Sequence, residues 1–338
     1  MLAYLAKRFF GSLLTLVGVS ILIFGIARII PGDTARLALG AAATNDEVKE
    51  YSERLGLNRS LPVQYIDYVG GVLHGDMGTS LYTNRPVLDD LRDGFPATLE
   101  LVLASATIMI VLGLSLGILS AWFRNGPIDH VMRVFSLLGV VTPTFVWAIF
   151  LMLVFSDRLG WLPISGRLGE DVVAPPTITG LYLVDSLVSG QFVTFWDALY
   201  HIVLPAISLA LPGLGQAARL TRVNIVDAYS QPYAEMARVY GLSRRKIALK
   251  YMLRPALIPT MTVLGLDIAS KLGNAFLVES VFVWPGIANY GVRTILQKDL
   301  NGIIGTVLII SAFFLIVNML VDAGVALLDP RIRLVGAQ

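Results

Sequence analysis

Long apolar runs alternate with polar segments along the whole chain. A helix needs about 20 apolar residues to cross the hydrocarbon core of a bilayer, and six runs satisfy that requirement. They cover roughly residues 9–30, 98–122, 134–155, 200–220, 257–278 and 303–327. The pattern therefore predicts an all-α membrane protein with six transmembrane helices.

The first apolar run follows Lys7 and Arg8, as the core of a secretory signal peptide would. A cleaved signal has an apolar core of only about 7 to 15 residues, and this run is longer. We therefore expect residues 1–30 to form an N-terminus followed by a membrane anchor that is retained.

Composition agrees with this picture, because 55% of the 338 residues are hydrophobic and only 15% are charged. The basic residues are concentrated in alternate polar segments. Four segments share this excess: the one before the first run, the one between the second and third, the one between the fourth and fifth, and the one after the sixth. Together they hold 14 lysines and arginines but only four acidic residues. By the positive-inside rule, we expect these segments and both termini to lie in the cytoplasm.

The first predicted external segment, residues 31–97, contains two helix signatures. Thr44 and Glu47 have the spacing of a capping box. Further along, Pro62 suits the first turn of a helix whose apolar residues share one stripe. That helix either lies along the outer membrane surface or is an ordinary connection between spans. The stripe consists of Val63, Ile66, Val69 and Leu73.

Several kinds of chemistry are excluded by missing residues and motifs. The sequence has no cysteine, only three scattered histidines and no H-E-x-x-H pattern, so we expect no metal site. It has no phosphate-binding loop and no G-x-S-x-G nucleophile elbow. We therefore expect no catalytic residue in this chain and no cofactor bound by it alone.

The predicted cytoplasmic segment 222–256 combines strong helix signals with the densest positive charge. Ser230 is placed to cap a helix with Pro232 in its first turn, and Gly241 suits a left-handed helix end. Ser243 can cap a second, basic helix that leads into the fifth run. This charge by itself favours a loop held against anionic lipid headgroups over a contact with another protein.

Glu235-Met236-Ala237 followed by Gly241 resembles the EAA-x-x-x-G motif of permease subunits of bacterial ATP-binding-cassette importers, with Met236 where the motif has alanine. The stretch RPALIP at 254–259 is similar to the dipeptide/oligopeptide branch of that family. Five more stretches agree with that branch, in the same order: IIPGD at 29–33, LGLNRSLPVQY at 55–65, GDMGTSL at 75–81, LVESVFVWPGI at 277–287 and DPRIR at 329–333.

The resemblance implies a type I importer transmembrane fold in the bacterial cytoplasmic membrane, with its core at 98–328 and a cytoplasmic tail at 329–338. It also implies a coupling helix that docks on a cytoplasmic ATPase. The implied partners are a homologous second permease, two ATPases that bind ATP and Mg, and an external solute-binding protein, with no nucleic acid. The residues assigned to coupling are Tyr233, Glu235, Met236, Ala237, Arg238, Gly241 and Leu242.

The fifth run contains polar residues that should not face lipid. Asp267 and Lys271 lie four apart, so they share a helix face and can pair, and Asn274 lies on a nearby face. These three residues either line a translocation path shared with a partner or form part of a buried structural ion pair. In the second run, Gly113 and Gly117 suit close contact between helices.

The resemblance implies a non-catalytic transport subunit for peptides of the dipeptide/oligopeptide class. Glutathione, a nickel complex or an oligosaccharide are alternative substrates within the family. A self-sufficient ion-coupled secondary transporter is the alternative from another class, since Asp267 and Lys271 could serve ion coupling.

Overall fold

The computed structural model describes residues 2–29, 36, 39, 43–54, 58–243 and 246–328. The motif at 29–33 falls almost wholly outside this range, as do Arg244, Arg245 and the tail at 329–338. Every regular element of the described part is helical. The helices are α1 (Leu2–Ile29), α3 (Asn45–Arg54), α4 (Leu61–Leu73), α5 (Val87–Trp122), α6 (Pro127–Val141), α7 (Thr144–Leu151), η1 (Met152–Arg158), α8 (Tyr182–Val188), α9 (Phe192–Tyr229), α10 (Pro232–Val239), η2 (Ile247–Met252), α12 (Leu253–Val281), α13 (Ile287–Leu296) and α14 (Leu300–Leu328).

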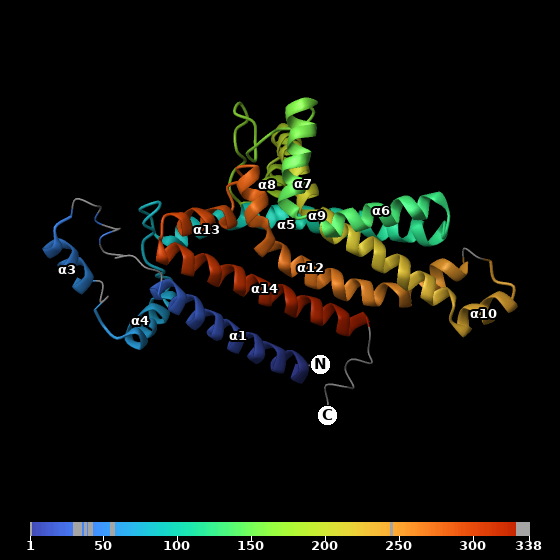
Figure 1. Cartoon of the computed structure of the whole chain (residues 1–338), viewed down its shortest axis with the longest axis horizontal. Helices are drawn as coiled ribbons and strands as arrows, with labels where there is room; N and C mark the ends of the chain where they lie inside the picture. The colour runs from blue at the N-terminus through green and yellow to red at the C-terminus, as the bar shows by residue number, and fades with distance from the viewer. Residues whose placement is uncertain are drawn as a thin grey trace.

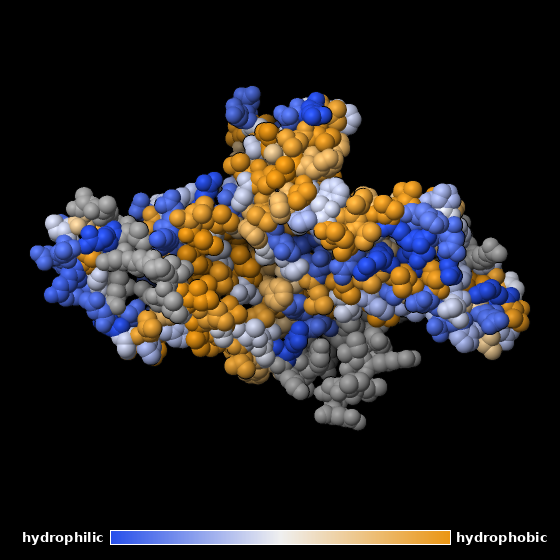
Figure 2. Space-filling model, in the orientation of Figure 1, coloured by the Kyte–Doolittle hydropathy of each residue, from blue (hydrophilic) through white to orange (hydrophobic). Residues whose placement is uncertain are grey.

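Five of the predicted spans are confirmed as long apolar helices. Within the described residues, α1, α5, α9, α12 and α14 are long and apolar enough to cross a membrane. They run along the long axis of the molecule, with α1 against α14 and α12 between α14 and α9 (Figure 1). Polar surface gathers toward the two ends of this axis and apolar surface between them, which is the distribution that a bilayer requires (Figure 2).

The third predicted span, 134–155, is not one continuous helix but is divided by a sharp bend. The chain bends by 109° between α6 and the helix formed by α7 and η1, and the two halves together are a broken span or a re-entrant loop. Thr142 is extended and Pro143 precedes α7. Proline lacks an N–H and disfavours helical backbone at the residue before it, so the helix stops there although the apolar run continues.

The centre of the bundle is α9. In its most apolar stretch of 18 residues 72% of the residues are buried, whereas in the corresponding stretch of α1 only 6% are buried. Small residues let α5 approach it closely. A Cβ atom on Gly113 would lie 2.6 Å from the Cβ of Ala217, and one on Gly117 would lie 2.5 Å from the Cβ of Thr221. The predicted close contact is therefore confirmed, and it is made within this chain.

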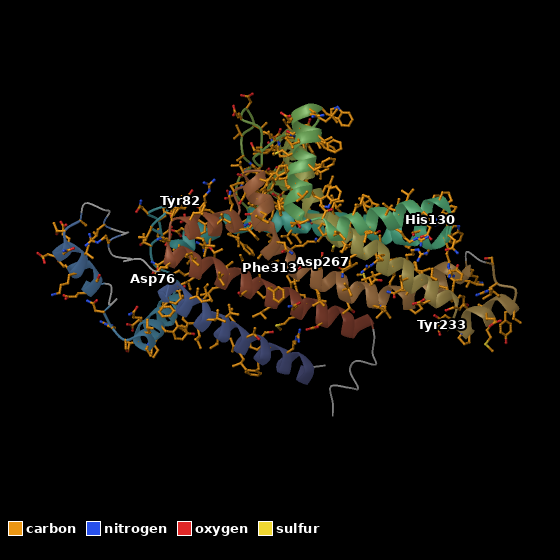
Figure 3. The ribbon with its side chains drawn as sticks, in the orientation of Figure 1. Asp76, Tyr82, His130, Tyr233, Asp267 and Phe313 are labelled. Atoms are coloured by element: carbon orange, nitrogen blue, oxygen red, sulfur yellow. The ribbon has the colours of Figure 1, made fainter. Side chains whose placement is uncertain are left out.

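One end of the bundle carries α3, α4, α13 and the loop at 74–86, where Asp76 and Tyr82 lie (Figure 3). His130 and Tyr233 lie toward the opposite end. The turn between α5 and α6 thus shares an end with α10, as the charge pattern predicts for two segments on the same side of the membrane. At the first end, the chain leaves α12 through Pro285 and Gly286 before α13, and the capping box of Thr44 and Glu47 forms.

Candidate functional site

The short helix α10 begins as the sequence predicts, with Pro232 in its first turn, but its cap is different. Ser230 belongs to the end of α9, where its hydroxyl donates a hydrogen bond of 2.7 Å to the carbonyl of Asp227. The N-cap of α10 is Gln231, whose backbone is extended. The prediction that Ser230 caps α10 is wrong because its hydroxyl already bonds to the preceding helix.

The end of α10 is a tight turn around Gly241, which has a φ of +70°. The amide of Leu242 donates to the carbonyl of Ala237 at 3.2 Å, and the amide of Gly241 donates to that of Arg238 at 2.9 Å. These two bonds form a Schellman motif, which needs a left-handed residue where glycine carries the least strain. The predicted role of Gly241 in ending the helix is confirmed.

One face of α10 is packed against its own chain. Ala234 is fully buried and Ala237 is 7% exposed, in a cluster with Ile247 and Met252 of η2. Ala237 was predicted among the residues that contact an ATPase. The structure places it inside the segment, where its small side chain lets α10 and η2 pack closely.

The opposite face of α10 exposes large apolar side chains at the end of the bundle. Solvent-exposed apolar groups in one place mark surfaces that bind something else. Val239 at 82% exposed and Tyr240 at 78% were missed by the sequence analysis. The spacing from the buried alanines could have revealed Val239, since it lies on the other side of the helix, whereas Tyr240 is the C-cap residue, where the helix ends. This docking face consists of Tyr233, Met236, Val239 and Tyr240.

Polar contacts fix α10 to the end of α9. The guanidinium of Arg238 donates a hydrogen bond of 2.8 Å to the carbonyl of Tyr229, which belongs to the last turn of α9. Glu235 is exposed and makes no ion pair within the described part of the chain. Ser243 accepts a hydrogen bond from the amide of Lys246 at 3.4 Å and so begins the helix that continues into α12.

A groove of about 490 Å³ lies beside α10, between the ends of α5 and α9 and the start of α12. Its walls are mostly apolar, and Arg124 and Arg238 contribute its positive charge. The docking face and this groove lie at the end of the bundle predicted to be cytoplasmic, and together they offer an apolar and positively charged surface suited to contact with another protein.

The polar residues of α12 are only partly brought together. The Nζ atom of Lys271 lies 3.0 Å from the Oδ2 atom of Asp267 and donates to the carbonyl of Leu209 on α9, also at 3.0 Å. Lys271 is 3% exposed, whereas Asn274 is exposed and contacts neither of them through a hydrogen bond. The predicted pair is confirmed, and it joins α12 to α9.

Two sequence models of known families match the chain. The binding-protein-dependent transport system inner membrane component matches residues 113–334, and the N-terminal part of the membrane component of such systems matches residues 1–102. The matched ranges contain all the residues of the docking face and of the fifth span.

Individual relatives cover almost the full chain. The probable D,D-dipeptide transport system permease protein of Escherichia coli is 41% identical, over 97% of this chain and 96% of its own length. The dipeptide transport system permease protein of Alkalihalophilus pseudofirmus is 36% identical over 98% and 100%. The glutathione transport system permease protein of Pectobacterium atrosepticum is 33% identical over 98% and 99%.

Proposed function

Because the chain belongs to the family of binding-protein-dependent transport system inner membrane components, we propose that it forms half of the membrane path of an ATP-driven peptide importer. It is a multi-pass permease subunit of the inner membrane. The names of two relatives described above say that they transport dipeptides. The third is named for glutathione, which is itself a tripeptide. The shared chemistry of these cargoes supports short peptides as the substrate class.

The docking face of α10 is the observation that carries the coupling role. It presents Tyr233 and Met236 to a partner while Ala234 and Ala237 hold the helix to its own chain. Aromatic residues and methionine are enriched in the contact surfaces of protein complexes. We assign this face to a cleft on a cytoplasmic ATPase subunit, and we assign to Gly241 and Leu242 the turn that holds the face in place.

The proposed assembly contains this chain, a homologous second permease, two ATPases and an external solute-binding protein. ATP and Mg would be bound by the ATPases, and this chain would carry out no chemistry. When nucleotide draws the ATPases together, α10 would move with them. Since Arg238 bonds α10 to α9 and the buried alanines pack α10 against η2, the movement would pass to the spans as a rigid-body rearrangement.

Asp267 and Asn274 are the proposed contribution of α12 to the path. The burial of Lys271 against the carbonyl of Leu209 favours a structural role for that residue. Replacing the pair together, as Asp267→Asn with Lys271→Met, avoids leaving one charge buried without its partner. We expect the double variant to assemble normally and to transport more slowly. Unchanged peptide uptake by the double variant would show that Asp267 is not part of the translocation path.

Reconstitution into liposomes tests the proposal. The chain together with its second permease, ATPases and binding protein should take up a labelled dipeptide only when ATP is supplied. The chain alone should show no uptake driven by a proton gradient. Proton-driven uptake by the chain alone would instead support a secondary transporter, and ATP-driven uptake of another solute but no peptide would overturn the substrate class.

A further inference from the structure

The helix α4 has an apolar flank that no described part of the chain covers. Ile66 is 67% exposed and Leu73 is 79% exposed, and Val63 on the same flank is also exposed. No residue of α4 is buried. A surface helix of a water-soluble protein buries its apolar flank, so this one is expected to contact another apolar medium.

The inner side of α4 is fixed to the first span. The hydroxyls of Ser20 on α1 and Tyr65 on α4 are hydrogen-bonded at 2.6 Å. The ring of Phe24 on α1 lies 5.5 Å from the ring of Tyr65 and 5.9 Å from that of Tyr68, measured between centroids. The position of α4 relative to α1 is therefore set by specific contacts.

These contacts give the depth of α4 in the membrane. The apolar span of α1 ends at Ala27, on the side predicted to be external. Ser20 lies seven residues before that end, which corresponds to about 10 Å along a helix, and Phe24 lies about 5 Å before it by the same rise. The side of α4 that touches these residues thus lies at the depth of the outer acyl chains.

Other apolar side chains of α1 at about the same depth, Ile21, Leu22 and Ile26, are also exposed, as expected for a part of the span that faces lipid. The polar flank of α4 points elsewhere, since Asp67 follows Ile66 by about 100° around the helix and pairs with Arg59 at 2.9 Å. Figure 1 shows α4 beside the end of α1, with the polar helix α3 beyond it.

We propose that α4 is an interfacial helix embedded in the outer leaflet of the bilayer, with Ile66 and Leu73 among the acyl chains and Asp67 in the water layer. Amphipathic helices of this kind lie in the membrane plane with the apolar face about 5 to 10 Å below the headgroup boundary, which is the depth that the α1 contacts give. The helix would anchor the external segment to the lipid and fix the tilt of α1.

Spin labels on single cysteines test this proposal, because the chain has no cysteine of its own. The variants are Ile66→Cys and, as a second site on the same flank, Leu73→Cys. Asp67→Cys on the polar flank is the matched control. Each is assembled with cysteine-free partner subunits into the complete importer in lipid nanodiscs, and its nitroxide is tested with oxygen, which partitions into lipid, and with a water-soluble nickel chelate.

Labels at Ile66 and Leu73 should collide more often with oxygen than with the nickel chelate, and the label at Asp67 should show the reverse. Equal access of nickel to all three positions would overturn the proposal. So would nickel access at Ile66 and Leu73 that disappears when the solute-binding protein is added, because the flank would then be a protein contact. Shielding of both positions from both reagents would place the flank against the second permease, which also overturns it.

Discussion

The helices α9 and α10 follow one another in the chain but are held in opposite ways. On α9, small residues let α5 and α6 come close on two sides: Ala217 lies against Gly113 of α5, and a Cβ atom on Gly215 would lie 2.6 Å from the carbonyl oxygen of Ser136 on α6. On α10, two alanines bury one side and large apolar groups remain exposed on the other. The difference suits a stiff helix that carries movement and a separate attachment point for the partner that causes it.

The close packing of α9 against α5 should be easier to disrupt than the attachment of α10. Gly117→Val places a branched side chain against Thr221 and the carbonyl of Ala218, and such overpacking costs about 1 to 3 kcal/mol. We expect a clearly lower thermal midpoint for the purified chain in detergent. Gly18→Val on α1 is the control, since a Cβ there meets nothing within 4 Å. Equal midpoints for the two variants would show that the seam between α5 and α9 tolerates expansion.

Gly241→Val should damage the attachment point more than the fold. A valine in left-handed backbone is strained by about 1 to 2 kcal/mol, so the turn after α10 should open and the docking face should lose its position. We expect loss of co-purification with the ATPase at a nearly unchanged thermal midpoint. Gly241→Asn should restore much of the binding, because asparagine tolerates this conformation. If the Gly241→Val variant still co-purifies with the ATPase, the turn is not needed for coupling.

The sequence predicted the spans better than it predicted their shapes. Hydropathy located α1, α5, α9, α12 and α14 because each is an unbroken apolar run. It could not show the bend before α7, since Pro143 lies within an equally apolar run and the bend angle depends on packing against α9. A proline inside a run also does not always stop a helix: α9 continues through Pro205 and Pro212.

The candidate site was predicted in outline for a similar reason. Gly241 could be assigned from the chain alone because a left-handed helix end is a local property. Which side of α10 is buried depends on η2, and nothing in the local pattern specifies where η2 packs. Ala237 was therefore expected to face the ATPase and is buried, whereas Val239 and Tyr240 were overlooked and are exposed.

Neighbouring residues of α10 provide a finer test of the two faces. Met236→Asp replaces an exposed apolar side chain, so the fold should be unaffected while ATPase affinity falls by about 1 to 2 kcal/mol. Ala237→Asp places a charge in the buried cluster of α10 and η2 and should lower the thermal midpoint. The measurements are binding of the ATPase to the permease in nanodiscs and the melting curve. The reverse pattern would mean that α10 docks through its other side.

The smallest expected effect concerns the connection between the two helices. Arg238→Met keeps the length of the side chain but removes the hydrogen bond to the carbonyl of Tyr229, a loss of about 1 kcal/mol. The ATPase should still bind, since the docking face is intact, but α10 should pull less effectively on α9. We therefore expect fewer peptides imported per ATP hydrolysed. Arg219→Met is the control, because Arg219 is exposed on α9 and has no hydrogen bond within the described residues. Both variants could import as many peptides per ATP hydrolysed as the unmodified chain. In that case the movement must reach the spans through η2 and α12 instead.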